Sequence, residues 1–287
     1  MTTKIILGIC CLIAVYSLFS CTKEGEQGPP GPPGDTGVYV PLKGDIRGNV
    51  IVYDSLGRAL ADYSGVIVTI DSTDLADTTD ASGAYSFSQV PAGRYNFSYS
   101  KEGYGTYRII RQLHPGGAQP TQLADADVGQ IYFGPPVEYV SYMGFGGPQL
   151  HEIYPFAVFL APMQVPTALV LYIGVGAPSK TDFVTSTRDY QATNDYPTEY
   201  LGSFEISPTM IYGDSVLVNA HRITFSLAFD NPRDIHYIDE KGRIIYPCTS
   251  PILGSFQLSA LTFTPPFEQS RRRNDGVYPL LRRSRLK

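Results

Sequence analysis

Four aspartates recur at every third position of one short segment, and carboxylates so close together could hold a cation. They are Asp71, Asp74, Asp77 and Asp80. Calcium takes about six to eight oxygen ligands from a bent loop, and this spacing lacks the pattern of an EF-hand loop. We therefore expect solvated carboxylates and turn-forming aspartate side chains in this segment.

The four histidines are His114, His151, His221 and His236, and their spacing matches no zinc-protease motif. The chain also has no Gly-x-Ser-x-Gly elbow and no glycine-rich phosphate loop after a strand. His221 and His236 could meet across neighbouring strands, where a hydrogen-bonded role is favoured over metal binding. The sequence thus predicts no enzyme activity, no cofactor and no metal site.

The first 20 residues have the layout of a secretory signal peptide. Lys4 supplies a positive charge, and an apolar run follows from residue 5 to residue 16. That run is too short for a membrane-spanning helix, which needs about 20 apolar residues. The segment ends at Leu18-Phe19-Ser20-Cys21.

These last four residues resemble the lipobox of bacterial lipoproteins, although Phe19 is bulkier than the usual residue there. The resemblance implies cleavage after Ser20 and a thioether-linked diacylglycerol on Cys21, which would hold the chain at a membrane. The alternative is an ordinary signal peptide with a chance cysteine. Cys10 and Cys11 would leave with the signal peptide, so Cys248 has no disulfide partner and is predicted to be a buried apolar residue.

Residues 21–41 are predicted to form a spacer. A short acidic stretch resembles that of lipoproteins exported to the cell surface, and Gly-X-Y triplets in register follow from Gly25 to Gly37, as in collagen. Four triplets are few for a triple helix, so we favour a stiff spacer of ~3.1 Å per residue, or roughly 40 Å. The alternative is a trimeric stalk.

Composition favours an all-β protein outside this N-terminal region. Of 287 residues, 43% are hydrophobic and only 17% charged, while 28 Gly and 23 Pro suit many tight turns. The net charge of −5 does not indicate a nucleic-acid binder, which usually has a broad basic surface. Seven of the 22 basic residues lie in the tail 269–287, which we expect to be a solvated end. The alternative is contact with acidic headgroups or phosphates.

Residues 42–134 show the period of two that predicts strands. Apolar residues alternate with polar ones in four segments, namely 46–52, 66–71, 85–88 and 95–99. Turn residues separate them: Gly57 and Gly83 end Asp-containing turns, Gly83 with an expected positive φ, and Pro91 to Gly93 suggests a tight hairpin.

The order of these segments resembles the carboxypeptidase regulatory-like family, a transthyretin-type β-sandwich. The matching pieces are Gly48-Asn49-Val50, Asp54-Ser55-Leu56-Gly57, Gly65-Val66-Ile67-Val68, Thr79 to Phe87, Val90 to Tyr95, and Lys101-Glu102-Gly103-Tyr104. The resemblance covers a quarter to a third of the chain and implies a non-catalytic module. Related folds include starch-binding modules, so it also implies a carbohydrate-binding role.

Residues 135–268 are predicted to form a second β-sandwich, immunoglobulin-like or fibronectin type III-like, after the boundary at Gly134-Pro135-Pro136. Strands are predicted at 169–173, 216–220, 223–229, 235–238, 244–246 and 256–263. Asp239 to Gly242 is typical of a hairpin turn, and 175–203 is predicted to be a long loop.

Together these features predict a lipid-anchored protein of a Gram-negative cell envelope, at the outer membrane and facing either the periplasm or the cell surface. It would serve as a binding or scaffold module for carbohydrate or an envelope protein, without binding nucleic acid. The alternative is a structural or adhesin-like stalk. Tyr104 and Tyr107 could offer rings on which sugars stack, although strands also need tyrosines for packing.

The anchor can be tested by mass spectrometry of the mature protein. We expect the N-terminal peptide to begin at Cys21 and to carry acyl chains, because the signal peptide ends there. An unmodified Cys21 with residues 1–20 still attached would contradict the prediction.

Overall fold

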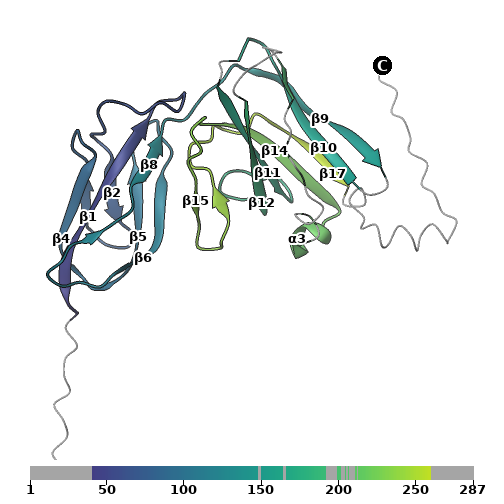
Figure 1. The fold of residues 1–287 in the computed structure, drawn as a ribbon. Helices are drawn as coiled ribbons and strands as arrows, with labels where there is room; N and C mark the ends of the chain where they lie inside the picture. Colours follow the sequence, from purple (N-terminus) through teal and green to yellow (C-terminus); the bar gives the residue numbers. More distant parts are fainter. Residues whose placement is uncertain are drawn as a thin grey trace, which may run out of the picture. The chain divides into compact units, whose positions relative to one another are not determined.

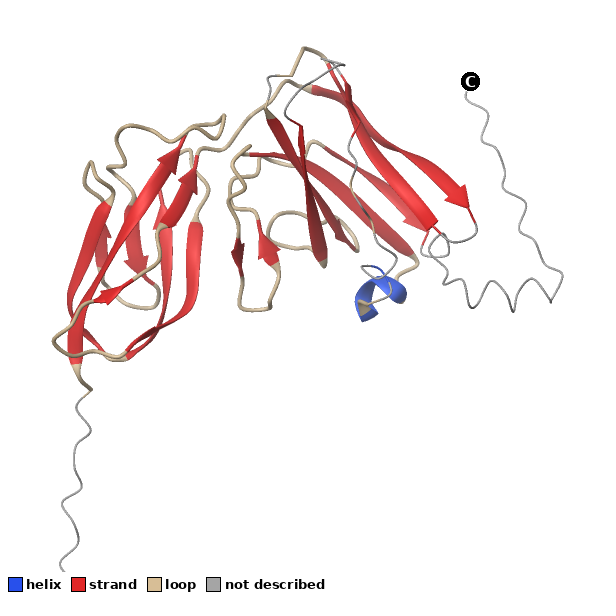
Figure 2. Cartoon of the chain, in the orientation of Figure 1, coloured by secondary structure: helices blue, strands red, loops and turns tan. Residues whose placement is uncertain are grey.

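The computed structural model describes residues 41–147, 150–163, 166–191, 199–201, 204, 206, 211 and 213–259. These residues form an all-β fold, as the composition predicts, with strands in nearly every segment (Figures 1 and 2). The signal peptide at 1–20, Cys21, the spacer up to residue 40 and the tail at 269–287 lie outside the described residues.

Two sheets make up the first sandwich. The strands of one sheet are β1 (Lys43–Tyr53), β4 (Ala84–Pro91), β7 (Thr121–Gln122) and β8 (Ala126–Gly129). Here β1 is central, antiparallel to β4 and parallel to β7 and β8. The antiparallel strands of the other sheet, in spatial order, are β3 (Ala76–Thr78), β2 (Ile67–Ile70), β5 (Gly93–Ser100) and β6 (Tyr107–His114). The family resemblance implies such a sandwich, whereas local periodicity did not reveal β3, β6, β7 and β8.

Alternation explains why these strands pack face to face. Every second residue of β1 is buried, from Ile46 to Val52, and β5 and β2 bury Phe97, Tyr99 and Val68 against them. Such a period of two places one side of each strand in the core. The core of the first sandwich lies between the two sheets.

Aspartate side chains and glycines form the turns between these strands. Gly83 has a φ of 83°, and a Cβ there would lie 2.1 Å from the carbonyl oxygen of Val50. The Asp80 carboxylate accepts hydrogen bonds from the backbone N–H groups of Ser82 and Ala84. Gly57 also has a positive φ, 76°, after a similar turn at Asp54. Only glycine adopts this conformation without steric cost.

The predicted hairpin from Pro91 to Gly93 is wrong. Strand β4 pairs with β1, whereas β5 pairs with β2 and β6, so the chain crosses from one sheet to the other here. The Tyr95 hydroxyl donates a hydrogen bond to the Pro91 carbonyl oxygen at 2.8 Å and so closes the corner. A tight turn in the sequence predicts a reversal of direction, but pairing between distant strands decides which sheet each strand joins.

The second sandwich is antiparallel throughout the described residues. The strands of its smaller sheet are β13 (Glu199–Leu201), β10 (Leu150–Phe159) and β9 (Val137–Gly147). The strands of its larger sheet are β12 (Thr185–Gln191), β11 (Thr167–Gly174), β14 (Arg222–Asp230) and β17 (Gly254–Ser259). A separate hairpin joins β15 (Tyr237–Ile238) to β16 (Ile244–Ile245) through a turn in which Gly242 has a φ of 80°. This is the turn that Asp239 to Gly242 predicts.

Two expectations for this sandwich are wrong. The strand predicted at 216–220 is a helical turn, α3 (Ser215–Val218), because the Asp214 carboxylate caps it by accepting from Val216 N and Leu217 N. The loop predicted at 175–203 contains β12 and β13. Strand β12 escapes a periodicity search because its residues are polar and half-buried on both faces. Part of the strand predicted at 256–263 lies beyond the described residues.

Strand β14 is buried on both faces, unlike the half-buried strands of the first sandwich. Its apolar face packs into the core between the sheets, while Ala228 on the other face packs against Ile245 and Tyr246. Asp230 ends the strand at 0% exposure and pairs with Arg188 Nε at 2.7 Å. Burial raises the pKa of Asp230, and the Arg188 guanidinium opposes this rise.

This buried pair yields a stability prediction. Asp230→Ala should lower the free energy of unfolding by about 3–5 kcal/mol, because it leaves the Arg188 charge in a site where the side chain is only 11% exposed. The double variant Arg188→Met/Asp230→Leu should recover part of that loss, since no unpaired charge remains, although the carbonyl oxygens of Asn231 and Pro232 lose their Arg188 donor. Guanidinium denaturation followed by circular dichroism measures both, and an equal loss in the single and double variants would contradict the prediction.

Candidate functional site

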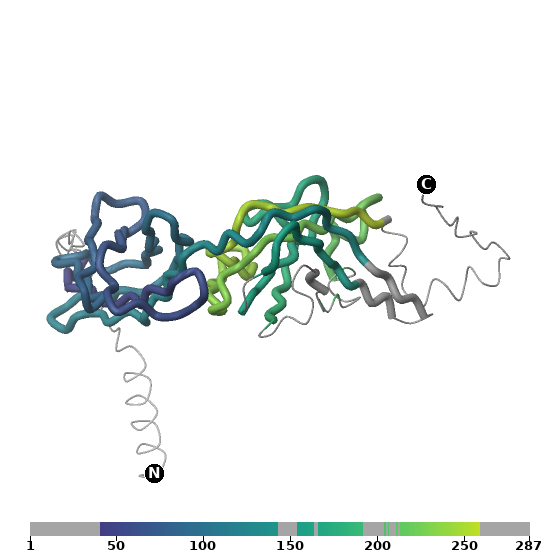
Figure 3. The backbone as a smooth tube through the Cα atoms, turned by 90° about the horizontal axis from the view of Figure 1, so that it is seen from above, coloured from purple at the N-terminus to yellow at the C-terminus, as the bar shows by residue number. Residues whose placement is uncertain are grey.

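A junction between the two sandwiches positions the candidate site. The chain passes from the first sandwich into the second near residues 130–136 (Figure 3). The Asn231 side-chain amide donates hydrogen bonds to the carbonyl oxygens of Asp54 and Gln130, each at 2.8 Å. Both amide protons of this buried residue are therefore used to join the sandwiches.

Glycines allow the backbones to approach closely at this junction. A Cβ on Gly105 would lie 2.5 Å from the carbonyl carbon and oxygen of Pro247, and one on Gly129 would lie 2.6 Å from the Ile235 side chain. Cys248 is buried beside Tyr53 and Ile235, as predicted for an apolar residue. Burial raises the pKa of its thiol to about 12, which excludes a reactive thiolate at neutral pH.

A pocket of about 350 Å³ opens at this junction, and we call it the junction pocket. Its walls come from the start of β6, the loop before β12 and the β15–β16 hairpin. Its lining residues are Tyr104, Gly105, Thr106, Arg108, Lys180, Thr181, Tyr237, Asp239, Glu240, Arg243, Ile245, Tyr246 and Pro247. Pockets that combine apolar walls with a few placed polar groups are suited to small ligands.

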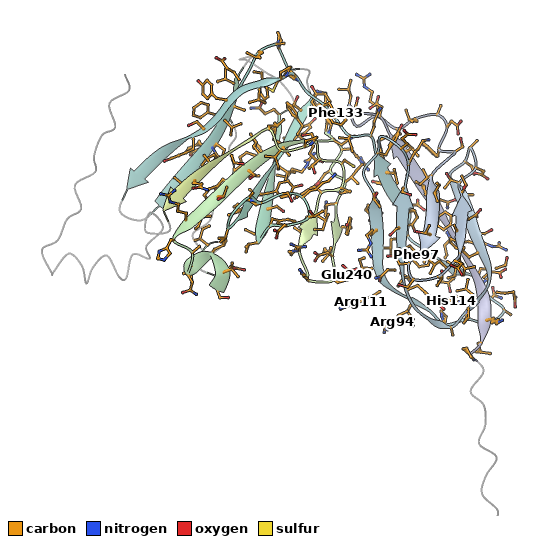
Figure 4. All side chains as sticks on the ribbon, turned by 180° about the vertical axis from the view of Figure 1, so that it is seen from behind. Arg94, Phe97, Arg111, His114, Phe133 and Glu240 are labelled. Carbon is orange, nitrogen blue, oxygen red and sulfur yellow. The ribbon has the colours of Figure 1, made fainter. Side chains whose placement is uncertain are left out.

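Ion pairs hold the polar wall of the junction pocket. The Arg108 guanidinium contacts Asp71 at 2.6 Å and Glu240, from the hairpin turn, at 3.0 Å. Figure 4 labels Glu240 at the turn of this hairpin. Arg243 contacts Asp239 at 2.8 Å and donates to the Phe183 carbonyl oxygen. Burial would raise the pKa of Asp239, but the N–H groups of Arg243 outweigh this effect and the pKa is lowered. Asp239 therefore stays ionised.

The tyrosines predicted as stacking residues have different positions. Tyr107 packs edge-on against Tyr237 and at a tilt against Tyr99, with ring centroids 5.9 Å and 6.0 Å away, so it belongs to the junction packing. Tyr104 lines the junction pocket, with Lys101 Nζ 5.4 Å from its ring centroid. Tyr237 also lines the pocket, from the hairpin. Sequence patterns do not pair it with Tyr104, because it lies in the other sandwich.

The remaining candidate groups hold structural contacts. Asp71 accepts from Ser98 Oγ besides pairing with Arg108, and Asp77 accepts from the Ser86 N–H. His236 Nδ1 lies 3.1 Å from Asp234 Oδ1. His236 precedes β15 and His221 precedes β14, and these two strands do not pair, so strand pairing does not bring the two histidines together. Within the described residues, no three His, Cys, Asp or Glu side chains are arranged to hold a metal ion. No helix in the described ranges is long and apolar enough to cross a membrane.

A larger cavity of about 500 Å³ lies beside the segment that joins the two sandwiches, and its lining differs in charge from that of the junction pocket. It is bordered by Ser55, Gln130, Ile131, Tyr132, Phe133, Gly134, Pro135 and Pro162, none of them charged. The junction pocket is lined by five charged residues as well as three tyrosines. It is therefore the stronger candidate for recognising a specific ligand.

Comparison with known proteins does not assign this chain to a family. No family model and no curated protein matches it. Among solved structures, a DUF3823 family protein from Bacteroides ovatus matches 76% of this chain and 99% of its own, with 17% identity and a TM-score of 0.26. A candidate carbohydrate-binding protein from Bacteroides uniformis matches the same shares, with 11% identity and a TM-score of 0.25.

A chain of a type II cohesin–X-dockerin complex from Acetivibrio cellulolyticus also matches, with 17% identity and a TM-score of 0.26. The match covers 30% of this chain and 58% of the cohesin–dockerin chain. With TM-scores below 0.5, none of these likenesses assigns a function, so the junction pocket has to be interpreted from its own geometry.

Gly105 provides a test of the close approach at the junction. Gly105→Ala should lower the free energy of unfolding by about 1–3 kcal/mol, because the added Cβ would collide with backbone atoms of Pro247. The same variant should also reduce the hydrogen-exchange protection of the backbone amides at positions 105 and 233. Gly103→Ala is the control: its φ of 79° costs about 1–2 kcal/mol, but its Cβ would meet no atom within 4 Å, so the protection should stay unchanged. Equal loss of protection in both variants would contradict this account.

Proposed function

We propose that the protein is a non-catalytic binding module of the bacterial cell envelope, held by a lipid on Cys21, and that its junction pocket binds a saccharide. The observation that supports this most is the lining of the pocket. Tyr104 and Tyr237 bring aromatic rings, and Thr106 and Thr181 bring hydroxyls. Sugars present apolar C–H faces and rows of hydroxyls, which suit aromatic rings and paired donors and acceptors.

The size of the junction pocket also fits this proposal. A volume of about 350 Å³ lies at the lower end of the range for small-ligand sites. It would hold one or two sugar rings at the end of a glycan, while the rest of the chain extends into solvent. Its floor is stable, because Asn231 and the close contacts at Gly105 and Gly129 hold the two sandwiches together.

The proposed anchor and spacer give the pocket a role at a membrane. Acylation of Cys21 would hold the chain outside the cytoplasm, and the Gly-Pro triplets would lift the folded residues away from the lipid. A module placed in this way retains glycans of the envelope or the surroundings for other proteins to use. The proposal includes no chemical step, since no catalytic set was found among the described residues.

Glycan-array binding of the full chain carrying Cys21→Ser, which keeps it unacylated, tests the proposal. We expect selective binding of a subset of saccharides, and Tyr104→Ala should weaken it about five- to tenfold by removing a ring from the pocket wall. Tyr190→Ala is the matched control, because Tyr190 is 48% exposed on β12 and does not line the pocket. Absence of glycan binding, or an equal loss in both variants, would overturn the proposal.

A further inference from the structure

The two partners of Arg108 differ in how firmly they are held. Asp71 is bound at 2.6 Å, is 23% exposed and accepts a second hydrogen bond from Ser98 Oγ at 2.7 Å. Glu240 is bound at 3.0 Å, is 42% exposed and lies in the turn of a hairpin whose strands have two residues each. Its other contact is a 3.4 Å hydrogen bond from Asn96. Glu240 is therefore the partner that can be exchanged.

The free energy of that exchange is small. A partly exposed ion pair contributes little to stability, since water solvates both charges when they separate. Because the Glu240 side chain is 42% exposed, it can turn away from Arg108 while the hairpin turn, which Asp239 holds, stays in place. A ligand carboxylate with comparable geometry can thus take the place of Glu240 on the Arg108 guanidinium, which is suited to planar anions.

The remaining charges of the junction pocket favour an anion. Asp239 is committed to its own turn, because it accepts from the N–H groups of Lys241 and Arg243 and from the Arg243 side chain. Lys180 lines the pocket, and none of the hydrogen bonds or ion pairs found among the described residues uses its ammonium group. When Glu240 turns away, Asp71 still pairs with Arg108, and Lys180 is the lining cation that no carboxylate of the described residues pairs with.

We infer that the saccharide bound in the junction pocket is acidic: the carboxylate of a uronic acid replaces that of Glu240 on Arg108 and is also contacted by Lys180. This inference rests on the proposed function and specifies its ligand class. Glu240 acts in the free protein as a stand-in for the ligand's carboxylate. It keeps the Arg108 guanidinium paired and oriented until the ligand arrives.

Calorimetric titration of the full chain carrying Cys21→Ser with a galacturonic acid trimer, and with the neutral galactose trimer, tests this inference. We expect the acidic trimer to bind at least tenfold more tightly, and its affinity to fall as salt rises. Glu240→Gln should raise the affinity for the acidic trimer about fivefold by removing the competing carboxylate. The neutral trimer should gain less, because it brings no carboxylate to Arg108.

Lys180→Met should lower the affinity for the acidic trimer about tenfold. Lys241→Met is its matched control, because Lys241 is an exposed lysine of the same hairpin turn that does not line the pocket. Equal binding of both trimers, equal losses in the two lysine variants, or weaker binding by Glu240→Gln would overturn the acidic ligand and leave the proposed function standing. Absence of binding by acidic and neutral saccharides alike would overturn the proposed function itself.

Discussion

The junction depends on one buried amide. Asn231 donates to carbonyl oxygens on two different turns of the first sandwich, one at Asp54 and one at Gln130. Behind it, Arg188 Nη2 donates to the carbonyl oxygens of Asn231 and Pro232, while Nε of the same guanidinium holds Asp230. In a buried polar network of this kind, the loss of one member leaves its partners unsatisfied, which is costly in a low-dielectric interior.

Close packing at this junction makes the pocket possible. Gly105 and Gly129 have no side chain that would separate the two sandwiches, and Cys248 fills the space between them as a small apolar residue. The start of β6 and the hairpin turn then lie near enough for Arg108 and Glu240 to form an ion pair. The pocket is thus a product of the way the sandwiches meet, and neither sandwich contains it alone.

The β15–β16 hairpin serves both the fold and the pocket. Ile245 and Tyr246 cover the outer face of β11 and β14, which explains why β14 is buried on both sides. Tyr237 packs on Tyr107 and lines the pocket. The β15–β16 hairpin, which lies between β14 and β17 in the chain, therefore covers the larger sheet and also lines the junction pocket.

The sequence by itself determined the local features of this protein. Alternation predicted β1 and β14, and the Asp-Gly pattern predicted the turns at Gly83 and Gly242, because side-chain period and turn chemistry depend on neighbouring residues. The Cys21 anchor is also a local pattern, and it stays a prediction. Polar β12 and the inter-sheet corner at Pro91 escaped this reasoning, since partners distant in the chain decide them. The helical turn α3 was missed although its Asp214 cap is local.

Only the tertiary structure decided the site. The contact between Asn231 and Asp54 joins residues 177 positions apart, and that between Asn96 and Glu240 joins residues 144 apart. No periodicity or motif encodes such pairs, because each side chain looks like an ordinary surface residue in its own segment. Tyr104 was identified as a candidate for its ring alone, whereas its partners Tyr237, Lys180 and Glu240 became visible when packing brought the two sandwiches together.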